Sequence, residues 1–131
     1  MREIKFRAID KNYSVANGYG YNVWRNGSLI LYDNGQIGIV ATADRYGRGM
    51  FTNEVIPETV GQYTGLKDKN GVEIYEGDIL KTKQGELHPI QYNEKTAQYT
   101  SEWLWLWALL EHPYFAEVIG NIYENPELLE V

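Results

Sequence analysis

Three Asn-Gly dipeptides, each lying between short apolar segments, constrain the fold of this chain more than any other feature. They are Asn26-Gly27, Asn34-Gly35 and Asn70-Gly71. A type I′ turn needs a positive φ at both central residues, and Asn followed by Gly reaches that conformation more readily than most pairs. Each dipeptide therefore predicts a tight hairpin, and we expect a chain built from antiparallel strands.

The segments around these turns have the length and pattern of strands. Residues 3–8 alternate polar and apolar side chains, which predicts a half-buried strand. Residues 18–43 predict a meander that turns at the first two dipeptides, with strands at 19–25, 28–33 and 36–42. Residues 52–62 predict an irregular connection or sheet edge, since they contain Pro57. Later strands are expected at residues 72–75, 79–82, 89–92, 97–101, 103–107 and 116–123, with a turn at 83–86.

Helix is expected at one place, a single short turn over residues 126–129 that has Pro at its first position. Thirteen glycines and eleven tyrosines in 131 residues agree with strands joined by many turns. The predicted class is mainly β, and the length suits one domain over residues 1–131.

Charge is distributed unevenly along the chain. Residues 1–50 hold seven Lys/Arg and four Asp/Glu, residues 51–131 hold five and fourteen, and the net charge is −6. An acidic majority repels phosphate backbones, which disfavours bulk attraction to nucleic acid. A candidate basic face remains, whose members are Lys5, Arg7, Arg25, Arg45 and Arg48. We favour the interpretation that these are solvated strand faces and keep nucleic-acid binding as the alternative.

Several kinds of catalytic chemistry find no support in the sequence. The chain has no cysteine, which excludes disulfides, thiolate nucleophiles and Cys-based metal sites. His88 and His112 are far apart and each precedes a proline, so they form no metal-ligand spacing. No Walker A, dinucleotide-binding or nucleophile-elbow motif occurs. We therefore expect no cofactor and no resident metal, and we favour a protein that is not an enzyme.

The densest carboxylate cluster consists of Glu73, Glu76 and Asp78. Paired carboxylates can hold a hard cation or perform acid–base chemistry, so a metal-dependent hydrolase is a third hypothesis. The favoured interpretation is that Asp78 braces the bend at Gly77 through backbone N–H groups.

Aromatic side chains are the remaining sign of function. Trp103, Trp105 and Trp107 alternate with leucines, and Tyr99 lies on the strand expected before them. Exposed aromatic side chains form hot spots in protein interfaces, whereas buried ones fill cores. Both interpretations stay open for these four residues, which we name as the candidate interaction surface.

Three separated motifs carry a family resemblance: KFRAID at residues 5–10, YTGLKDKNGVEIYEGDIL at 63–80 and VIGNIYENPELL at 118–129. Together they resemble the YopX-like family of bacteriophage and prophage proteins, with Ile9 at a position where that family usually has Trp. Eight residues of the matched motifs are of turn-forming types, and we expect them to have a structural role: Gly65, Asp68, Asn70, Gly71, Gly77, Asp78, Gly120 and Asn121.

The resemblance implies a mainly β fold in which antiparallel hairpins of an N-terminal meander, residues 1–56, pack on a small SH3-like barrel, residues 57–131. It implies a phage or prophage gene and no established activity. The resemblance implies a bacterial host. We expect a cytoplasmic protein, since residues 1–7 hold four charged side chains and no apolar core of signal-peptide length, and the longest apolar run, 103–110, is too short to span a bilayer. Partner predictions are an unknown host or phage protein, no membrane, and self-association through the Trp-rich segment.

Overall fold

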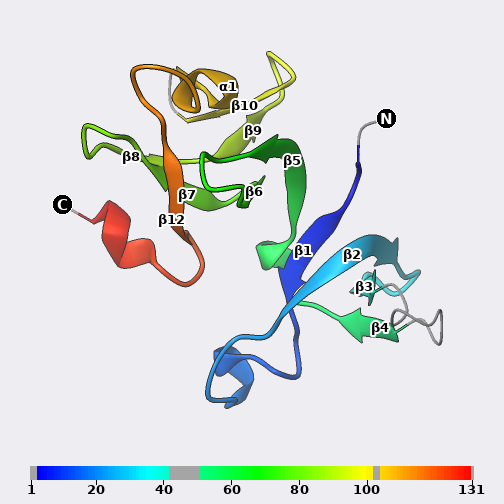
Figure 1. Cartoon of the computed structure of the whole chain (residues 1–131). Helices are drawn as coiled ribbons and strands as arrows, with labels where there is room; N and C mark the ends of the chain where they lie inside the picture. Colours follow the sequence, from blue (N-terminus) through cyan, green and yellow to red (C-terminus); the bar gives the residue numbers. More distant parts are fainter. Residues whose placement is uncertain (1–2, 42–50, 102–103, 131) are drawn as a thin grey trace. The chain divides into compact units, whose positions relative to one another are not determined.

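The computed structural model describes residues 3–41, 51–101 and 104–130. Antiparallel strands dominate this part of the chain (Figure 1), which confirms the mainly β class. The chain divides into two compact units, residues 1–62 and 63–131.

The first unit is a sheet with strand order β4-β3-β2-β1, and the beginning of β5 pairs with β1. Its strands are β1 (Phe6–Ile9), β2 (Trp24–Leu31), β3 (Ile37–Ala41), β4 (Phe51–Glu54) and β5 (Gly61–Lys67). Two 3₁₀ helices, η1 (Val15–Asn17) and η2 (Pro57–Thr59), lie in its loops. Ala8, Ile39 and Val55 form its buried core.

Asn26-Gly27 does not form the predicted turn. It lies within β2, whose residues 24–27 pair with β1 while residues 28–31 pair with β3. A Cβ atom at Gly27 would overlap the carbonyl oxygen of Val40 on β3. Glycine is present here because two backbones approach closely where the strand changes partner. The predicted strand at residues 19–25 is likewise wrong before Trp24, because η1 and turns occupy residues 15–21.

The other two dipeptides do lie in hairpin turns, which share one geometry with the turn at residues 82–86. The three turns span residues 32–36, 68–72 and 82–86. In each, the N–H of the first residue donates to the carbonyl of the fifth, and the N–H of a glycine at the fourth position donates to the carbonyl of the first. The glycines are Gly35, Gly71 and Gly85, with φ of 86°, 80° and 92°. Elsewhere in the described chain, the non-glycine residues with positive φ are Ala97 and Phe115. Asn34 and Asn70 are therefore not left-handed, and the turns are not type I′.

The second unit contains two three-stranded sheets and the pairing of β5 with β6 (Glu73–Tyr75). One sheet has the order β12-β7-β8, with β7 (Asp78–Lys81), β8 (Leu87–Pro89) and β12 (Glu117–Asn121). The other has the order β11-β10-β9, with β9 (Gln91–Asn93), β10 (Gln98–Ser101) and β11 (Leu104–Trp105). The 3₁₀ helix η3 (Pro126–Leu129) confirms the predicted C-terminal helical turn.

Residues 87–93 pass from one of these sheets to the other through Ile90. The N–H of Ile90 donates to the carbonyl of Asp78, and its carbonyl accepts from the N–H of Gly77. Its side chain enters a core formed with Ile74, Leu80, Leu106, Leu109 and Ala116. This continuous segment joins the two sheets, since it contributes β8 to one and β9 to the other, and the SH3-like barrel stays a prediction. No helix in the described part of the chain is long and apolar enough to cross a membrane.

The predicted strand over residues 103–107 is wrong beyond Trp105. β11 ends there, and a short helix, α1 (Leu106–Leu109), follows. Leu106 and Leu109 are both buried in the core. Residues three apart share one face of a helix but point to opposite faces of a strand. Helical backbone is therefore the conformation that lets both leucines enter the same core.

Candidate functional site

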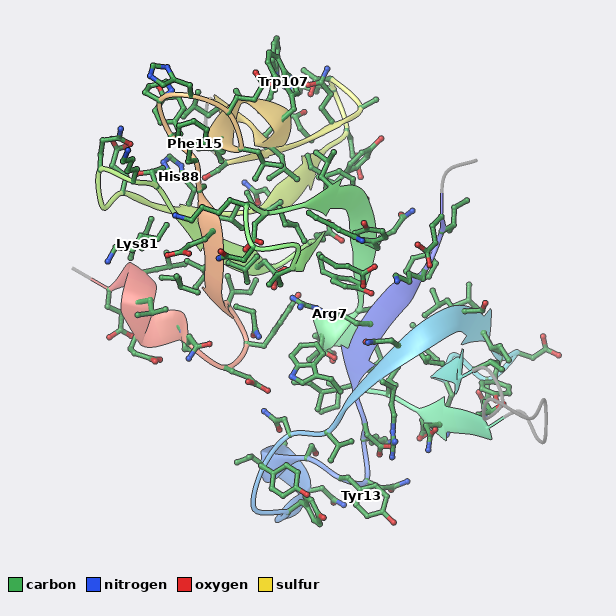
Figure 2. The ribbon with its side chains drawn as sticks, viewed as in Figure 1. Arg7, Tyr13, Lys81, His88, Trp107 and Phe115 are labelled. Atoms are coloured by element: carbon green, nitrogen blue, oxygen red, sulfur yellow. The ribbon has the colours of Figure 1, made fainter. Side chains whose placement is uncertain are left out.

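Trp105 and Trp107 form an exposed pair of indoles, which we call the tryptophan pair. Their ring centroids lie 5.6 Å apart with an interplanar angle of 32°. Trp105 is 43% exposed and Trp107 is 49% exposed. Figure 2 shows Trp107 pointing away from the ribbon of α1. Trp103, the third indole of the predicted surface, lies outside the described residues.

The sheet that carries Trp105 also carries a shallow groove. Trp105 pairs with Thr100, and Thr100 pairs with Gln91, so the three side chains lie on one face of the sheet. The groove encloses about 460 Å³ and is lined by Gln91, Tyr92, Asn93, Glu94, Lys95 and Thr100. Trp105 therefore shares a sheet face with Thr100 and Gln91, two residues that line this groove.

Tyr99, the fourth residue of the predicted surface, belongs to the other face of β10. It is half-buried, packs against the core and contacts the ring of Tyr92 at 5.2 Å. Adjacent residues of a strand point to opposite faces, which separates Tyr99 from the Thr100–Trp105 row. Core packing therefore accounts for Tyr99, and solvent exposure distinguishes the tryptophan pair.

The described members of the candidate basic face are already engaged by other groups. Lys5 pairs with Glu3 at 3.2 Å, and the guanidinium of Arg7 lies 4.9 Å from the ring centroid of Trp24. Arg25 donates from Nε to Asp10 Oδ2 at 2.9 Å. Arg45 and Arg48 lie outside the described residues. These contacts agree with a structural role for the described cations.

Asp10 is buried and has several donors around it. Its Oδ1 accepts from the backbone N–H groups of Asn12 and Tyr13, while Arg25 serves Oδ2. Burial by itself raises the pKa of Asp10, but the Arg25 hydrogen bond and the two backbone hydrogen bonds outweigh it, and the net pKa is lowered. Asp10 is therefore a charged brace that links β1, the following loop and β2.

The carboxylate cluster does not come together as a metal site. Asp78 is buried and its Oδ2 accepts from the backbone N–H of Tyr75 at 2.8 Å, so it braces the bend at Gly77 as expected. Across the ranges that the structure describes, no group of three or more His, Asp or Glu side chains is arranged to hold a metal ion. The hydrolase hypothesis gains no support from this geometry.

The central and C-terminal motifs contact each other through the residues named as turn formers. Asp68 Oδ1 accepts from the N–H groups of Asn70 and Val72, and its Oδ2 accepts from Val118 on β12. The side chain of Asn121 caps the N–H groups of Tyr123 and Glu124. The motifs therefore share a folding role, holding residues 68–78 against residues 117–125.

Two glycines in these motifs are required by their neighbours. A Cβ atom at Gly77 would lie 2.9 Å from Cε2 of Tyr123, and one at Gly120 would lie 2.5 Å from Oδ1 of Asn125. Gly77 also has a φ of 95°. Side chains of the C-terminal motif therefore occupy the space beside both glycines, which explains why this region needs them.

A buried polar group that sequence reasoning missed joins β8 to β10. His88 Nδ1 lies 3.1 Å from Ser101 Oγ, and His88 Nε2 lies 3.6 Å from a carboxylate oxygen of Glu86. The order Glu–His–Ser resembles a nucleophile with its base, but Ser101 is only 1% exposed. A substrate carbonyl has no access to this hydroxyl, and the group is best explained as a polar link inside the unit. No sequence spacing indicates it, because only the fold brings these residues together.

These features define a mainly β protein whose central and C-terminal motifs brace each other and whose exposed tryptophan pair lies outside the matched motifs. The model of the YopX protein family matches residues 5–130, and the chain belongs to this family. A solved structure, the crystal structure of protein EF1440 from Enterococcus faecalis, is similar over nearly the whole length. It shares 28% sequence identity, covers 99% of this chain and 100% of that chain, and has a TM-score of 0.60. No curated protein matches the chain.

Proposed function

We propose that this chain is a phage or prophage accessory protein that acts in the bacterial cytoplasm by binding another protein, without catalysis of its own. The tryptophan pair is the proposed contact surface. The observation that carries the proposal is the exposure of two neighbouring indoles in a unit that buries both Leu106 and Leu109 beside them.

Exposed indoles favour the binding of a protein partner on energetic grounds. Two large apolar rings held in water lose the favourable free energy of burial, which a partner would recover. Tryptophan is also enriched among the few interface residues that dominate binding energy. The groove along β9 adds polar side chains next to the pair, which suits the polar rim of a protein interface.

A pull-down from bacterial lysate with the full tagged chain tests this proposal. One half of the lysate is treated with nuclease, and the bait is compared with Trp105→Ala/Trp107→Ala. We expect a discrete protein in both halves with the natural sequence and its loss with the double variant. Leu31→Ala, which trims an exposed leucine of β2, serves as the matched control and should retain the partner.

Two other results would reject the proposal. Capture and self-association that are unchanged in the double variant, with an unchanged melting temperature, would show that the indoles are not a binding surface. Material retained only in the untreated half, with binding that weakens steeply as salt rises, would indicate nucleic-acid binding instead.

A further inference from the structure

A second exposed aromatic group lies in the first unit, far along the sequence from the tryptophan pair. Tyr13, Tyr19 and Tyr21, here called the tyrosine platform, lie in the loop between β1 and β2 and are 47%, 39% and 62% exposed. Their rings interlock edge to face, with centroids 5.3 Å apart for Tyr13–Tyr19 and 4.9 Å apart for Tyr19–Tyr21. Figure 2 shows Tyr13 at the outer end of this loop.

Hydrogen bonds hold this loop in one conformation. Val23 donates to the carbonyl of Tyr13, and Tyr19 donates to the carbonyl of Ser14, which is itself buried. The side chain of Asn22 accepts from the N–H of Val15, and Asp10 anchors the start of the loop through Asn12 and Tyr13. A surface ordered before binding loses less conformational entropy when a partner arrives.

The composition of the loop is that of protein-binding loops. Residues 12–22 read NYSVANGYGYN, so tyrosine, asparagine, glycine and serine make up nearly all of it. In binding loops, tyrosine provides rigid amphipathic contact area, while serine, glycine and asparagine provide hydrogen bonds. Such a loop fits a protein partner better than a bare phosphate backbone.

Charge indicates what kind of protein surface would fit. The sequence has no Asp or Glu between Asp10 and Asp33, although the whole chain has 18. The guanidinium carbon of Arg25 lies 6.0 Å from the ring centroid of Tyr13, and its side chain is 30% exposed. The ion pair of Arg25 with Asp10 uses Nε, and a guanidinium has further N–H donors.

The hydroxyls add hydrogen-bond donors at the same place. The oxygen atoms of Tyr19 and Tyr21 lie 3.5 Å apart. The hydrogen bond with Tyr21, together with its charge repulsion, raises the pKa of Tyr19, so this hydroxyl stays protonated at neutral pH. Two neighbouring phenols, on a platform whose Tyr13 ring lies beside Arg25, match the acceptor oxygens of a carboxylate.

We propose that the tyrosine platform binds a carboxylate-rich segment of a partner protein. The platform and the tryptophan pair would then be two separate contact surfaces, and neither proposal depends on the other.

Selection from a displayed library of random dodecapeptides on the full folded chain tests this inference. We expect enrichment of Asp and Glu in the selected peptides. A labelled copy of the most enriched peptide should bind about tenfold more weakly to Tyr19→Phe/Tyr21→Phe, which corresponds to the loss of one hydrogen bond to a charged group. Tyr32→Phe, which removes the hydroxyl of an exposed tyrosine just after β2, is the matched control and should bind as the natural sequence does.

The double phenylalanine variant keeps the rings, so its melting temperature should not change. Trp105→Ala/Trp107→Ala should leave peptide binding unchanged, which separates this inference from the proposed function. Three results would overturn the inference: no enriched peptide, no Asp/Glu enrichment, or equal affinity for the double phenylalanine variant. Binding of oligo-dT that is lost in that variant would overturn it as well, in favour of nucleic acid.

Discussion

The two units each contain a buried aspartate with the same local arrangement and a different distant partner. Asp10 and Asp68 both use Oδ1 to accept backbone N–H groups of the residues that follow them. The Oδ2 of Asp10 accepts from the charged side chain of Arg25, whereas the Oδ2 of Asp68 accepts from the backbone N–H of Val118. One local motif therefore serves two kinds of tertiary link.

The difference between these links has consequences for stability. A backbone donor is always present whatever residue occupies position 118, except proline, so the link at Asp68 depends on the fold of β12. The link at Asp10 depends on one side chain and on the charge of both partners. We therefore expect the two links to respond differently to substitution, and we expect the Asp10–Arg25 link to depend on pH.

The largest effect should come from Asp68→Ala. This change leaves three backbone N–H groups without their acceptor, and we expect a loss of about 3 kcal/mol in the free energy of unfolding. Urea unfolding at neutral pH measures it. Glu117→Ala, which removes a carboxylate that contacts Asn70 and Lys69 at the surface, is the control and should cost less than about 1 kcal/mol. Equal losses for both variants would contradict the role of Asp68.

A smaller loss, about 2 kcal/mol at neutral pH, is expected for Arg25→Met. The buried Asp10 then keeps its backbone donors but loses its cation, and the partial exposure of Arg25 keeps the cost below that of a fully buried pair. Urea unfolding again gives the value. Lys11→Met breaks the more exposed pair with Glu54 and should change stability by about 0.5 kcal/mol or less. If Arg25→Met lost no more unfolding free energy than Lys11→Met, Asp10 would not depend on the arginine for its contribution to stability.

Replacement of the turn glycines by alanine should lower the free energy of unfolding by similar, intermediate amounts in both units. Gly35, Gly71 and Gly85 have positive φ and open space at the position that a Cβ atom would take, so alanine meets only the backbone penalty. We expect each Gly→Ala change to cost about 1 kcal/mol. Gly20→Ala, which also has open space but no positive φ, should be near neutral. A Gly→Ala change that cost much more unfolding free energy at one turn than at the other two would show that tertiary contacts also constrain that turn.

The smallest effect should be a pH dependence of the Asp10–Arg25 link. The lowered pKa of Asp10 contributes stability that is present above the unfolded-state value, about 3.9, and is lost as pH falls through the folded-state value. Arg25→Met removes the main group that lowers this pKa. The difference in unfolding free energy between the natural sequence and Arg25→Met should therefore narrow as pH falls from neutral to about 3. A difference that stayed constant would argue against the Asp10–Arg25 link.

Local patterns predicted the parts of the fold that local geometry decides. Asn34-Gly35 and Asn70-Gly71 lie in hairpin turns because a glycine with positive φ is needed there, whatever surrounds it. The helical turn at residues 126–129 begins with a proline already restricted to a suitable φ. The family motifs were also recognisable in the sequence, although their mutual contacts were not.

The wrong predictions share one cause: residues distant in the sequence decided the local structure. Gly27 has the same dipeptide context as Gly35, yet it continues a strand because the Val40 carbonyl takes the space of a side chain. The Trp-rich segment turns helical because one core needs both Leu106 and Leu109. The alternating sequence pattern could not indicate that need.

The candidate sites divide in the same way. The sequence predicted Trp105, Trp107 and Tyr99 as members of one surface. The structure separates Tyr99 from the two indoles, because its side chain packs against the core. The buried His88–Ser101 link could not be found from spacing, because only the fold brings β8 and β10 together.

The sequence by itself determined the mainly β class, the hairpin turns at Gly35 and Gly71, the acidic net charge and the membership of a family. Each depends on backbone dihedral preference, residue counts or matched motifs, all of which are present before folding. The tertiary structure decided which glycine faces a backbone, which aromatic rings reach water and which distant donor each buried aspartate binds. These outcomes depend on the space and hydrogen-bond partners that remote segments supply, which no local window of sequence contains.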